Sequence, residues 1–523
     1  MKVQTILVHI AVLCFLLCLS VDRVSGQEKK LVCYFPNWTQ YRPAPGTFKV
    51  KDIDPFLCTH LVFAFSKVVN NFLRGYEYND DTSWRQFNAL KNSNPQLKTL
   101  LGVGGYSHGA APFTAMVATA GNRKTFIDST IQLLRTRGFD GLDFDWEYPG
   151  DSVASDKQNF AILLREFRTA VQEEASRTGR PPLLLAAAVA AGITRAEKAY
   201  DVPALNQYLD FVSIMTYDYH GTWEKVTGLA SPLAAPAGDD LNVESTVQWY
   251  MGQGLTPQKL VMGLPAFGRS WTLASVSDTS VGAPAPTPGT KGRFTGEPGM
   301  LSYYEICEYL YRGMTQTLQL DPLGQVAYGN LGNQWVTFEN ISTLNTKLDY
   351  ILNNNFAGAM IWSLDHDDFT GAFCAQGRNP LFSAVSSRIK NAGTGSFTTP
   401  IVTSAPITAA PTTAAPTTRV PTTPPPTTPP PPPPTTTRRT TRRTTAAPTT
   451  VRTPATSPGR AGSPDAPFEC PDDKGGYGYY PHPTKCNIYF TCYAFLPIEV
   501  SCPFDWNFNP RAQHCEKDYS CGA

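Results

Sequence analysis

Gly138-Phe-Asp-Gly-Leu-Asp-Phe-Asp-Trp-Glu-Tyr-Pro149 is the stretch on which the interpretation of the whole sequence depends. From residue 142 onward it alternates apolar and acidic residues, so an extended strand places Asp143, Asp145 and Glu147 on one face. Burying adjacent like charges costs stability unless one carries a proton or a cation lies among them. Folding alone does not favour this row of acids, and we therefore expect it to serve function.

Two other interpretations of this row are weaker. A solvated acidic edge strand is disfavoured because the opposite face carries the large apolar residues Leu142, Phe144 and Trp146. A divalent-metal site would need a second acidic or histidine cluster nearby to complete an oxygen cage, and the adjacent sequence offers none. We therefore expect neither a metal ion nor another cofactor.

Strands and helices alternate through the first three quarters of the chain. Apolar β-rich runs recur at residues 31–38, 60–68, 98–105, 139–147, 183–190, 211–219, 259–267 and 356–364. Helix-length segments such as 122–137 and 157–178 lie between most of them. Eight such strand-helix units predict an α/β fold, a (β/α)8 TIM barrel over residues 27–390. Residues 268–343 are too long for one crossover and are expected to form a small α+β insertion between the seventh and eighth units.

Aromatic and polar residues gather where the predicted strands end. The first strand ends in Tyr34-Phe-Pro-Asn-Trp38, the sixth in Met215-Thr-Tyr-Asp-Tyr-His220 and the eighth in Trp362-Ser-Leu-Asp365. Active sites of such barrels lie at this end of the strands. A pyranose ring has an apolar face that needs a flat partner, so this arrangement favours a carbohydrate cleft.

The spacing of the acids limits the chemistry that they can support. Glycosidases usually place two carboxyls on opposite sides of the scissile bond, ~5 to 5.5 Å apart when configuration is retained. Same-face neighbours on one strand stand ~6.5 to 7 Å apart and point the same way, so Asp145 and Glu147 cannot flank the bond. Glu147 can reach a glycosidic oxygen, but no second acid of the row can attack the far face.

Asp140, Asp143, Asp145 and Glu147 match the DxxDxDxE signature of family 18 glycoside hydrolases, and residues 30 to 388 resemble animal chitinases of that family. The resemblance implies substrate assistance, in which the 2-acetamido carbonyl attacks its own anomeric carbon and an oxazolinium intermediate gives net retention. Glu147 would be the general acid and then the base. Asp145 would orient the acetamido group, Asp143 would share a proton with Asp145, and Asp140 would have a structural role.

The same resemblance implies further sugar contacts. The Tyr217 hydroxyl would hold the acetamido oxygen, Asp218 would contact the sugar and Trp362 would form the floor beneath it. The remaining implied substrate-binding residues are Tyr34, Trp38, Phe65, Glu77, Tyr78, Gly104, Gly105, Tyr106, Ser107, Tyr148, Met215, Thr216, Trp223 and Arg269. The sequence departs from its relatives at four of these positions or near them. Tyr78 and Tyr106 stand where Trp is common, Ser107 where Asn is usual and Phe267 where Tyr is frequent.

The N-terminal residues predict a secreted, extracellular protein. A basic start, an apolar run from Ile6 to Leu19 and the small-residue spacing of Val24-Ser25-Gly26 are typical of a signal peptide over residues 1–26. The alternative, a membrane anchor, is disfavoured because the run is shorter than the ~20 residues that span a bilayer. Sequons at Asn37 and Asn340 are possible glycosylation sites, although Asn37 lies close to a predicted active-site strand.

Residues 391–464 predict a disordered, Thr/Pro-rich linker, because they hold almost no large apolar residue. Their Thr-Pro richness leads us to expect O-glycosylation. Seven arginines and no acids fall within 395–464, so a formal net charge of +1 leaves the rest of the chain at −6. A mildly acidic folded part argues against nucleic acid as a partner. A neutral polymer fits better, and we expect a monomer that binds chitin and chitooligosaccharides.

Residues 465–523 form a small module with six cysteines and many aromatics. Three disulfides would stabilise so short a segment, and spacing alone leaves 15 connectivities open; zinc is disfavoured because tight CxxC pairs are absent. The module resembles the peritrophin-A type chitin-binding domain, with Tyr489 and Trp506 expected to face sugar. The two resemblances imply the pairs Cys33–Cys58, Cys307–Cys374, Cys470–Cys492, Cys486–Cys521 and Cys502–Cys515.

These observations together predict a secreted endo-acting chitinase with a chitin-binding anchor. A catalytically inactive chitin-binding lectin or matrix protein is the alternative from another class, and Glu147 argues against it. An endo-β-N-acetylglucosaminidase acting on N-glycans is the alternative among enzymes. The C-terminal module and the run of aromatics count against that activity.

Overall fold

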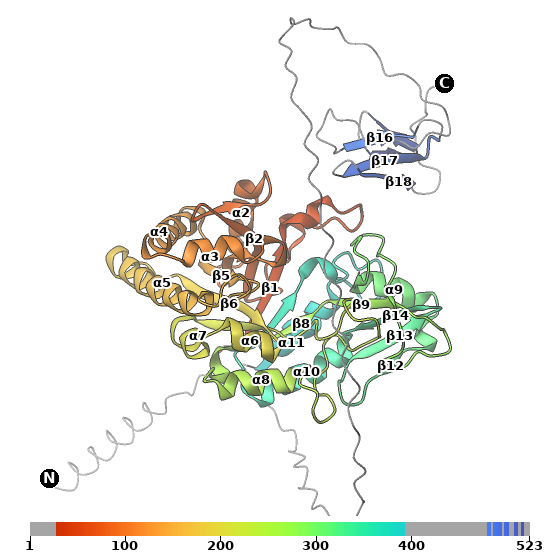
Figure 1. Cartoon of the computed structure of the whole chain (residues 1–523). Coiled ribbons are helices and arrows are strands. Elements are labelled where there is room, and N and C mark those ends of the chain that lie inside the picture. The colour runs from red at the N-terminus through yellow and green to blue at the C-terminus, as the bar shows by residue number, and fades with distance from the viewer. Residues whose placement is uncertain are drawn as a thin grey trace, which may run out of the picture. The chain divides into compact units, whose positions relative to one another are not determined.

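The computed structural model describes residues 28–392, 478–482, 485–493, 496–501, 507–510 and 514–516. The chain divides into two compact units, one before residue 406 and one after it, and each is described by itself (Figure 1). The predicted signal peptide and nearly all of the predicted linker lie outside the described residues. Among the described helices, none has both the length and the apolar character needed to cross a bilayer.

The first unit is built on a closed parallel barrel, which confirms the predicted fold. Its eight strands are β1 (Lys30–Pro36), β2 (His60–Val69), β4 (Lys98–Gly104), β5 (Gly141–Asp145), β6 (Leu184–Ala190), β7 (Phe211–Met215), β8 (Leu260–Pro265) and β15 (Gly358–Trp362). Strand β1 pairs with both β2 and β15, which closes the sheet. The short strand β3 (Phe72–Gly75) pairs antiparallel with β2 and extends it as a hairpin.

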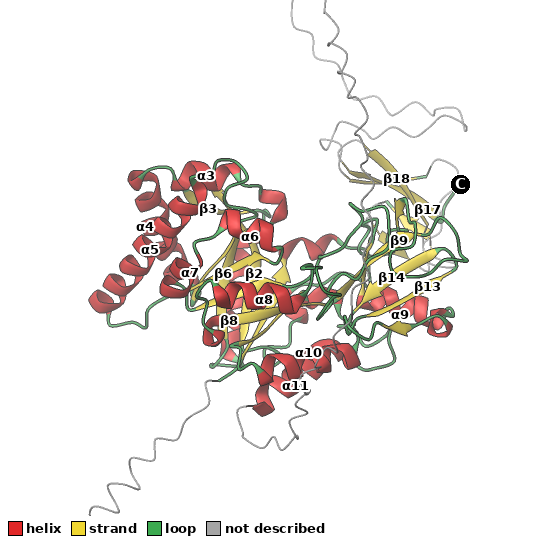
Figure 2. Ribbon diagram, turned by 60° about the horizontal axis from the view of Figure 1, so that its bottom comes forward, coloured by secondary structure: helices red, strands yellow, loops and turns green. Residues whose placement is uncertain are grey.

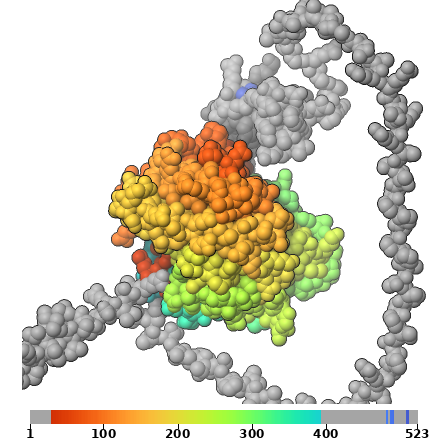
Figure 3. Space-filling view, turned by 60° about the vertical axis from the view of Figure 1, so that its left-hand side comes forward, coloured from red at the N-terminus to blue at the C-terminus, as the bar shows by residue number. Residues whose placement is uncertain are grey.

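Helices surround this barrel on its outside (Figure 2). They are α2 (Asp80–Ala89), α3 (Ala111–Val117), α4 (Ala120–Arg137), α5 (Asp156–Thr178), α6 (Ile193–Ala199), α7 (Val202–Tyr208), α8 (Val243–Gly252), α10 (Ile341–Asn353) and α11 (Pro380–Ala392). Short 3-10 helices are η1 (Asn37–Tyr41), η2 (Val50–Asp52), η3 (Leu90–Asn92), η4 (Tyr106–His108), η5 (Pro257–Lys259), η6 (Met314–Gln316) and η7 (Leu364–His366). In Figure 3 the residues coloured orange and yellow form a continuous outer surface on this face.

Helices α4 and α5 contain the two segments predicted from helical spacing. Helix α4 begins where the Thr119 side chain accepts a hydrogen bond from the Asn122 backbone. It ends at Gly138, whose φ of 83° is the left-handed conformation that a glycine adopts at low cost. The chain therefore turns directly from α4 into β5, the strand that carries the acids.

The alternating residues of β5 face two different environments. Phe144, on the apolar face, packs edge to face against Phe160 and Phe167 of α5, with ring centroids 5.7 and 6.0 Å apart. Trp146 stacks on Phe113 of α3 at 5.0 Å. The acids point the other way, into the barrel. The hydrophobic contacts under the helices therefore fix the direction in which the carboxyls project.

The insertion between β8 and α10 forms a second, antiparallel sheet. Its elements are β9 (Phe267–Thr272), β10 (Thr287–Pro288), β11 (Met300–Ser302), α9 (Tyr303–Tyr311), β12 (Gln319–Leu320), β13 (Ala327–Leu331) and β14 (Gln334–Phe338). The strand order is β10-β9-β14-β13-β12, with β11 paired to β9. This confirms the predicted α+β insertion. Strand β9 begins two residues after β8 ends, so the insertion sheet grows directly out of a barrel strand.

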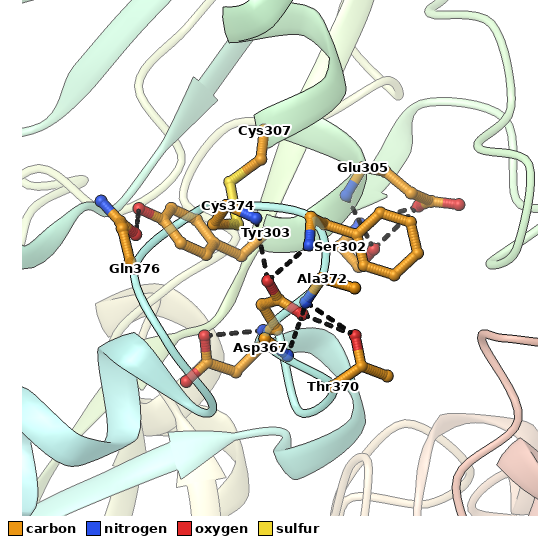
Figure 4. The surroundings of a disulfide bond; sticks show 12 residues. Ser302, Tyr303, Glu305, Cys307, Asp367, Thr370, Ala372, Cys374 and Gln376 are labelled. Carbon is orange, nitrogen blue, oxygen red and sulfur yellow. Dashed lines mark hydrogen bonds between the residues drawn. A yellow bond between two sulfur atoms is a disulfide. The ribbon is translucent and has the colours of Figure 1, made fainter.

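Two disulfides hold loops of this unit in place, and they are the pairs that the resemblance implies. Cys33 on β1 is bonded to Cys58, and Cys307 on α9 to Cys374 after β15. Figure 4 shows the second bond, where the Tyr303 hydroxyl donates to Gln376 over 3.0 Å. The disulfide between Cys307 and Cys374 fastens the insertion to the loop that follows the last barrel strand.

The second unit contains a three-stranded antiparallel sheet and a hairpin. The sheet is formed by β16 (Gly478–Pro481), β17 (Ile488–Tyr493) and β18 (Leu496–Ser501), and the hairpin by β19 (Asn507–Asn509) and β20 (His514–Glu516). The three predicted cystine pairings of this module, and the side chains of Tyr489 and Trp506, lie outside the described part of the chain.

Candidate active site

The acidic row lies at the C-terminal end of β5, but the strand is shorter than predicted. We expected it to run to Glu147, and it ends at Asp145. The neighbouring strand β4 also ends there: Gly104 is the last residue paired, and Gly105 donates its backbone N–H to the Asp145 carbonyl over 2.8 Å. Residues after Asp145 have no strand partner, so Glu147 stands on the loop just beyond the barrel.

Other barrel strands end earlier than predicted for the same reason. Strand β1 ends at Pro36, β7 at Met215 and β15 at Trp362, where we expected extended chain to residues 38, 219 and 364. Each chain leaves the sheet and enters the loops that carry the site. The hydrophobic pattern continues into these loops because some of their side chains are still buried: Tyr219 and Leu364 belong to the main hydrophobic core.

Asp143 and Asp145 are buried inside the barrel, with 0% and 4% of their surface exposed. Burial raises the pKa of Asp143 to about 7, and a hydrogen bond donated by the Tyr34 hydroxyl over 2.7 Å partly opposes the rise. Burial and the charges of Glu147 and Asp143 raise the pKa of Asp145 well above its usual range. The Oδ1 atom of each aspartate is buried without a hydrogen-bond partner. Burying both acids as carboxylates is costly, which favours one proton shared by the pair.

Glu147 is partly buried, and burial is the main reason that its pKa rises to about 7. The nearby charge of Asp218 raises the pKa further, whereas hydrogen bonds from Tyr148 and from the Tyr106 backbone lower it. A carboxyl with this pKa is protonated in a large fraction of molecules at neutral pH, as a general acid requires.

Asp218 is held by Arg269 of the insertion strand β9. The guanidinium donates two hydrogen bonds, Nε to Oδ1 over 2.7 Å and Nη2 to Oδ2 over 2.8 Å. Both carboxylate oxygens are therefore engaged by one partner. Asp218 has a φ of 58°, a left-handed conformation that non-glycine residues seldom adopt and that is found where surrounding structure demands it. The barrel and the insertion thus meet at this ion pair.

Four aromatic rings gather at the ends of β1, β2 and β15. The Trp362 ring is stacked on Phe65 at 5.8 Å and 15°, and it lies 5.4 Å from Tyr34 and 6.2 Å from Trp38. Trp38 has 40% of its surface exposed and Tyr34 only 1%. The cluster therefore runs from the barrel interior, where Tyr34 contacts Asp143, to an open aromatic face.

Two glycines let β4 approach the acids closely. A Cβ atom at Gly104 would lie 2.1 Å from the Asp145 carbonyl oxygen, and one at Gly105 would lie 2.6 Å from the Phe65 ring. Their φ angles of 115° and 81° also disfavour any side chain. These predicted binding residues contribute space and backbone conformation.

Strand β7 contributes the next group. Tyr217 is in edge-to-face contact with Phe267 at 5.9 Å, and its hydroxyl lies 3.8 Å from the Met360 sulfur. Burial raises the pKa of Tyr217, so the hydroxyl keeps its proton and can donate it in a hydrogen bond. Thr216 instead donates to the Gly263 carbonyl over 2.7 Å, a bond between neighbouring strands. Met215 packs against the inner barrel cluster.

The remaining predicted binding residues line the exposed surface. Tyr78, Tyr106 and Trp223 have 89%, 82% and 61% of their surface exposed, so their rings are open to a ligand. Ser107 is exposed beside Tyr106. Glu77 accepts a hydrogen bond from the Tyr41 hydroxyl over 2.7 Å.

Two features of the site escaped the sequence analysis. The Arg195 guanidinium of α6 lies 4.9 Å above the Tyr148 ring and is ion-paired with Asp151. Asn37, a sequon residue, is only 3% exposed, and its amide donates to both carboxylate oxygens of Asp80 over 2.9 and 3.1 Å. An attached glycan has no room at Asn37 in this fold. Each contact joins segments about 40 residues apart, a relation that strand or helix periodicity does not reveal.

Asp140 lies outside the site and has a structural place. Its Oδ2 atom accepts hydrogen bonds from the Thr99 backbone and from Lys91, each over 2.8 Å. These bonds connect the residue before β5 to the start of β4 and to η3. Three of the four motif acids therefore lie toward the C-terminal end of β5, whereas Asp140 stabilises the opposite end of the barrel, where the strands begin.

Comparisons with known protein families identify both units. The model described as Glycosyl hydrolases family 18 matches residues 30–367. The model described as Chitin binding Peritrophin-A domain matches residues 470–521.

The similar proteins include one described as an active chitinase and one described as a pseudo-chitinase. Chitotriosidase-1 of Mus musculus is 44% identical over 363 residues, 68% of this chain and 77% of that protein. The crystal structure of an immunomodulatory active chitinase from Trichuris suis matches with 37% identity and a TM-score of 0.67, over 69% of this chain and 100% of that one. Human YKL-39, described as a pseudo-chitinase with retained chitooligosaccharide binding, matches with 41% identity and a TM-score of 0.65, over 69% and 99%.

Proposed function

Because the chain belongs to family 18 of the glycosyl hydrolases and carries a peritrophin-A chitin-binding domain, we propose that it is a secreted chitinase. It hydrolyses β-1,4 linkages between N-acetylglucosamine units with retention of configuration, and it acts within the polymer. The observation that carries this proposal is Glu147, a partly buried carboxyl with a pKa of about 7 beside two buried aspartates.

Glu147 first donates its proton to the glycosidic oxygen, and the leaving sugar departs with that oxygen. The electron-deficient anomeric carbon then needs a nucleophile on its far face. Asp143 and Asp145 lie on β5, the strand that leads directly to Glu147, and so approach the sugar from the same side as Glu147. Asp218 has both carboxylate oxygens bonded to Arg269. None of these three is free to attack, which supports the 2-acetamido carbonyl of the substrate as the nucleophile.

The other residues orient that acetamido group. Asp145, protonated or sharing a proton with Asp143, accepts from the acetamido N–H, and the protonated Tyr217 hydroxyl donates to the acetamido oxygen. The stacked pair of Trp362 and Phe65 supports the sugar at the point of cleavage. Glu147, now a carboxylate, takes a proton from water as the water opens the oxazolinium ring.

The C-terminal module serves in this proposal as an anchor on insoluble chitin. Its tether raises the local concentration of the barrel at the polymer surface. The predicted signal peptide, the disulfides of the barrel and the module itself support secretion. The protein works as a monomer, without metal or other cofactor.

A second candidate function is chitooligosaccharide binding without catalysis. The observation in its favour is the similarity to human YKL-39, a pseudo-chitinase. Against it stands the complete row of acids in this chain, in which Glu147 retains a carboxyl poised for proton transfer.

Substitution of Glu147 by Gln separates the two functions. We expect Glu147→Gln to bind N-acetylglucosamine hexamer as tightly as the wild type while hydrolysis falls by roughly 10²- to 10⁴-fold, the usual share of a general acid. Glu244→Gln, which alters a partly buried glutamate of α8, is the matched control and should leave both properties unchanged. Wild-type protein that binds the hexamer but releases no product would establish the lectin instead.

A further inference from the structure

A chain of hydrogen bonds joins two segments at the edge of the aromatic cluster. One segment is η1, which follows β1, and the other is the turn at residues 77–80 that leads into α2. Besides the Asn37–Asp80 contact, Asn79 and Gln40 exchange two hydrogen bonds over 2.7 and 3.3 Å. The Tyr41 hydroxyl donates to Glu77 over 2.7 Å. We call this set the η1 zipper.

The centre of the η1 zipper is buried. Asp80 has only 2% of its surface exposed, and its Oδ2 atom also accepts the Glu77 backbone N–H over 2.9 Å. A Cβ atom at Gly75 would lie 2.8 Å from the Asp80 Cβ atom, so the turn closes tightly over this carboxylate. Asn37 in turn donates to the Phe65 carbonyl over 3.4 Å. A buried carboxylate stabilises a fold poorly, which points to a role in fixing geometry.

Besides Tyr41, whose hydroxyl belongs to the η1 zipper, each segment carries a further exposed aromatic ring. Trp38 follows Asn37 directly, and Tyr78 lies between Glu77 and Asn79, both members of the zipper. Trp38 is braced on its inner side by Phe65 at 6.2 Å, whereas Tyr78 is 89% exposed. No packing of its own holds Tyr78 firmly in place, so the hydrogen bonds on both sides of it set its position relative to Trp38.

We propose that the Asn37–Asp80 pair is a specificity-determining positioning pair that fixes the separation of Trp38 and Tyr78, and so makes the cleft prefer long N-acetylglucosamine chains. The inference rests on the proposed function. A long oligomer stacks on both rings at once and gains from their fixed spacing, because the cost of ordering them has already been met in folding. A short substrate that occupies only the neighbourhood of Glu147 does not use that spacing.

Substitution of Asp80 by Asn tests the pair. Both carboxylate oxygens accept hydrogen bonds, so an amide group turns an N–H toward a donor, either the Asn37 amide or the Glu77 backbone. We expect KM for the N-acetylglucosamine hexamer to rise roughly two- to tenfold, the size expected when one side chain must be ordered on binding instead of on folding. Both kcat and KM should stay unchanged on an aryl glycoside of the N-acetylglucosamine dimer.

Asp81→Asn is the matched control, since the neighbouring Asp81 pairs with Arg85 and Arg137 outside the η1 zipper. Tyr78→Ala completes a double-mutant cycle, in which Asp80→Asn should add little to a protein that already lacks the ring. Tyr41→Phe loosens the exposed end of the zipper without a buried change, and it should raise KM for the hexamer by a smaller factor.

Three outcomes would overturn the proposal. Equal losses on the hexamer and on the dimer glycoside would mean that Asp80 only supports the barrel, and unchanged kinetics on both would mean that it positions nothing. Additive effects of Asp80→Asn and Tyr78→Ala would place its action elsewhere. If the wild type hydrolyses neither substrate, the proposed function fails, but the same comparison by calorimetric binding of the hexamer still tests the pair.

Discussion

The raised pKa of Glu147 predicts the pH dependence of hydrolysis. Changing the pH changes the activity, because Glu147 must carry a proton to act on the glycosidic oxygen. Burial raises its pKa from an ordinary 4.5 to about 7. The sign follows directly: the acid form persists below the raised pKa and is lost as the pH rises through it. We therefore expect kcat/KM to fall above about pH 7.

The size of the effect follows from the two pKa values. At pH 6 a group with the raised pKa is about 90% protonated, whereas a group at 4.5 would be about 3% protonated, so the site gains roughly 30-fold in its active form. Above neutral pH, kcat/KM should fall about tenfold for each further unit. The assay is the initial rate on soluble N-acetylglucosamine hexamer, well below KM, from pH 4 to pH 10.

A charge variant connects this profile to Glu147. The positive charge of Arg195 lowers the pKa of Glu147, so Arg195→Met should move the alkaline limb to higher pH. Arg180→Met, which removes an exposed arginine beyond the end of α5, serves as the control and should leave the limb in place. A limb near pH 4.5, a profile flat to pH 9, or a shift of the limb to lower pH in Arg195→Met would each refute the reasoning.

Three further predictions concern the anchor, the core and the β4 turn. Deleting residues 465–523 should reduce activity on solid chitin far more than on soluble oligomers, and equal losses in the two rate assays would mean that the module is no anchor. Lys347→Met leaves the buried Glu339 unpaired and should lower the free energy of unfolding by about 3 to 5 kcal/mol in denaturant melts, whereas adding Glu339→Leu should restore most of it. Gly104→Ala forces a Cβ atom against the Asp145 carbonyl and should lower kcat even in protein that remains folded by circular dichroism, so unchanged kcat would contradict the close approach.

Much of the barrel could be predicted because its signals are periodic. The alternation along β5 distinguishes the face that packs on α5 from the face that points into the barrel, and helical spacing predicted a helix over residues 122–137, where α4 lies. The insertion was visible as a stretch too long for one crossover. These features depend on residues close together in the chain, where sequence spacing translates directly into geometry.

The parts that escaped prediction depend on contacts between distant segments. Asp218 has a left-handed conformation and forms an ion pair with Arg269, 51 residues away. Arg195 on α6 contacts Tyr148 in the loop after β5. Asn37, just after β1, contacts Asp80, which follows the β2–β3 hairpin. Strand ends were misplaced because residues beyond them, such as Tyr219 and Leu364, are still buried in the core and keep an apolar pattern. Such details need the closed barrel before they can be assigned.

The ion pair between Asp218 and Arg269 also limits how the insertion and the barrel can be recombined among relatives. Strand β9 starts at Phe267, two residues after β8 ends, so residues 267–338 could be exchanged between relatives as a cassette with short junctions. The cassette carries Arg269, while Asp218 stays in the recipient barrel. A chimera that brings a different residue at position 269 would leave Asp218 without its partner next to Glu147. Successful transplants should therefore be those in which donor and recipient match at these two positions.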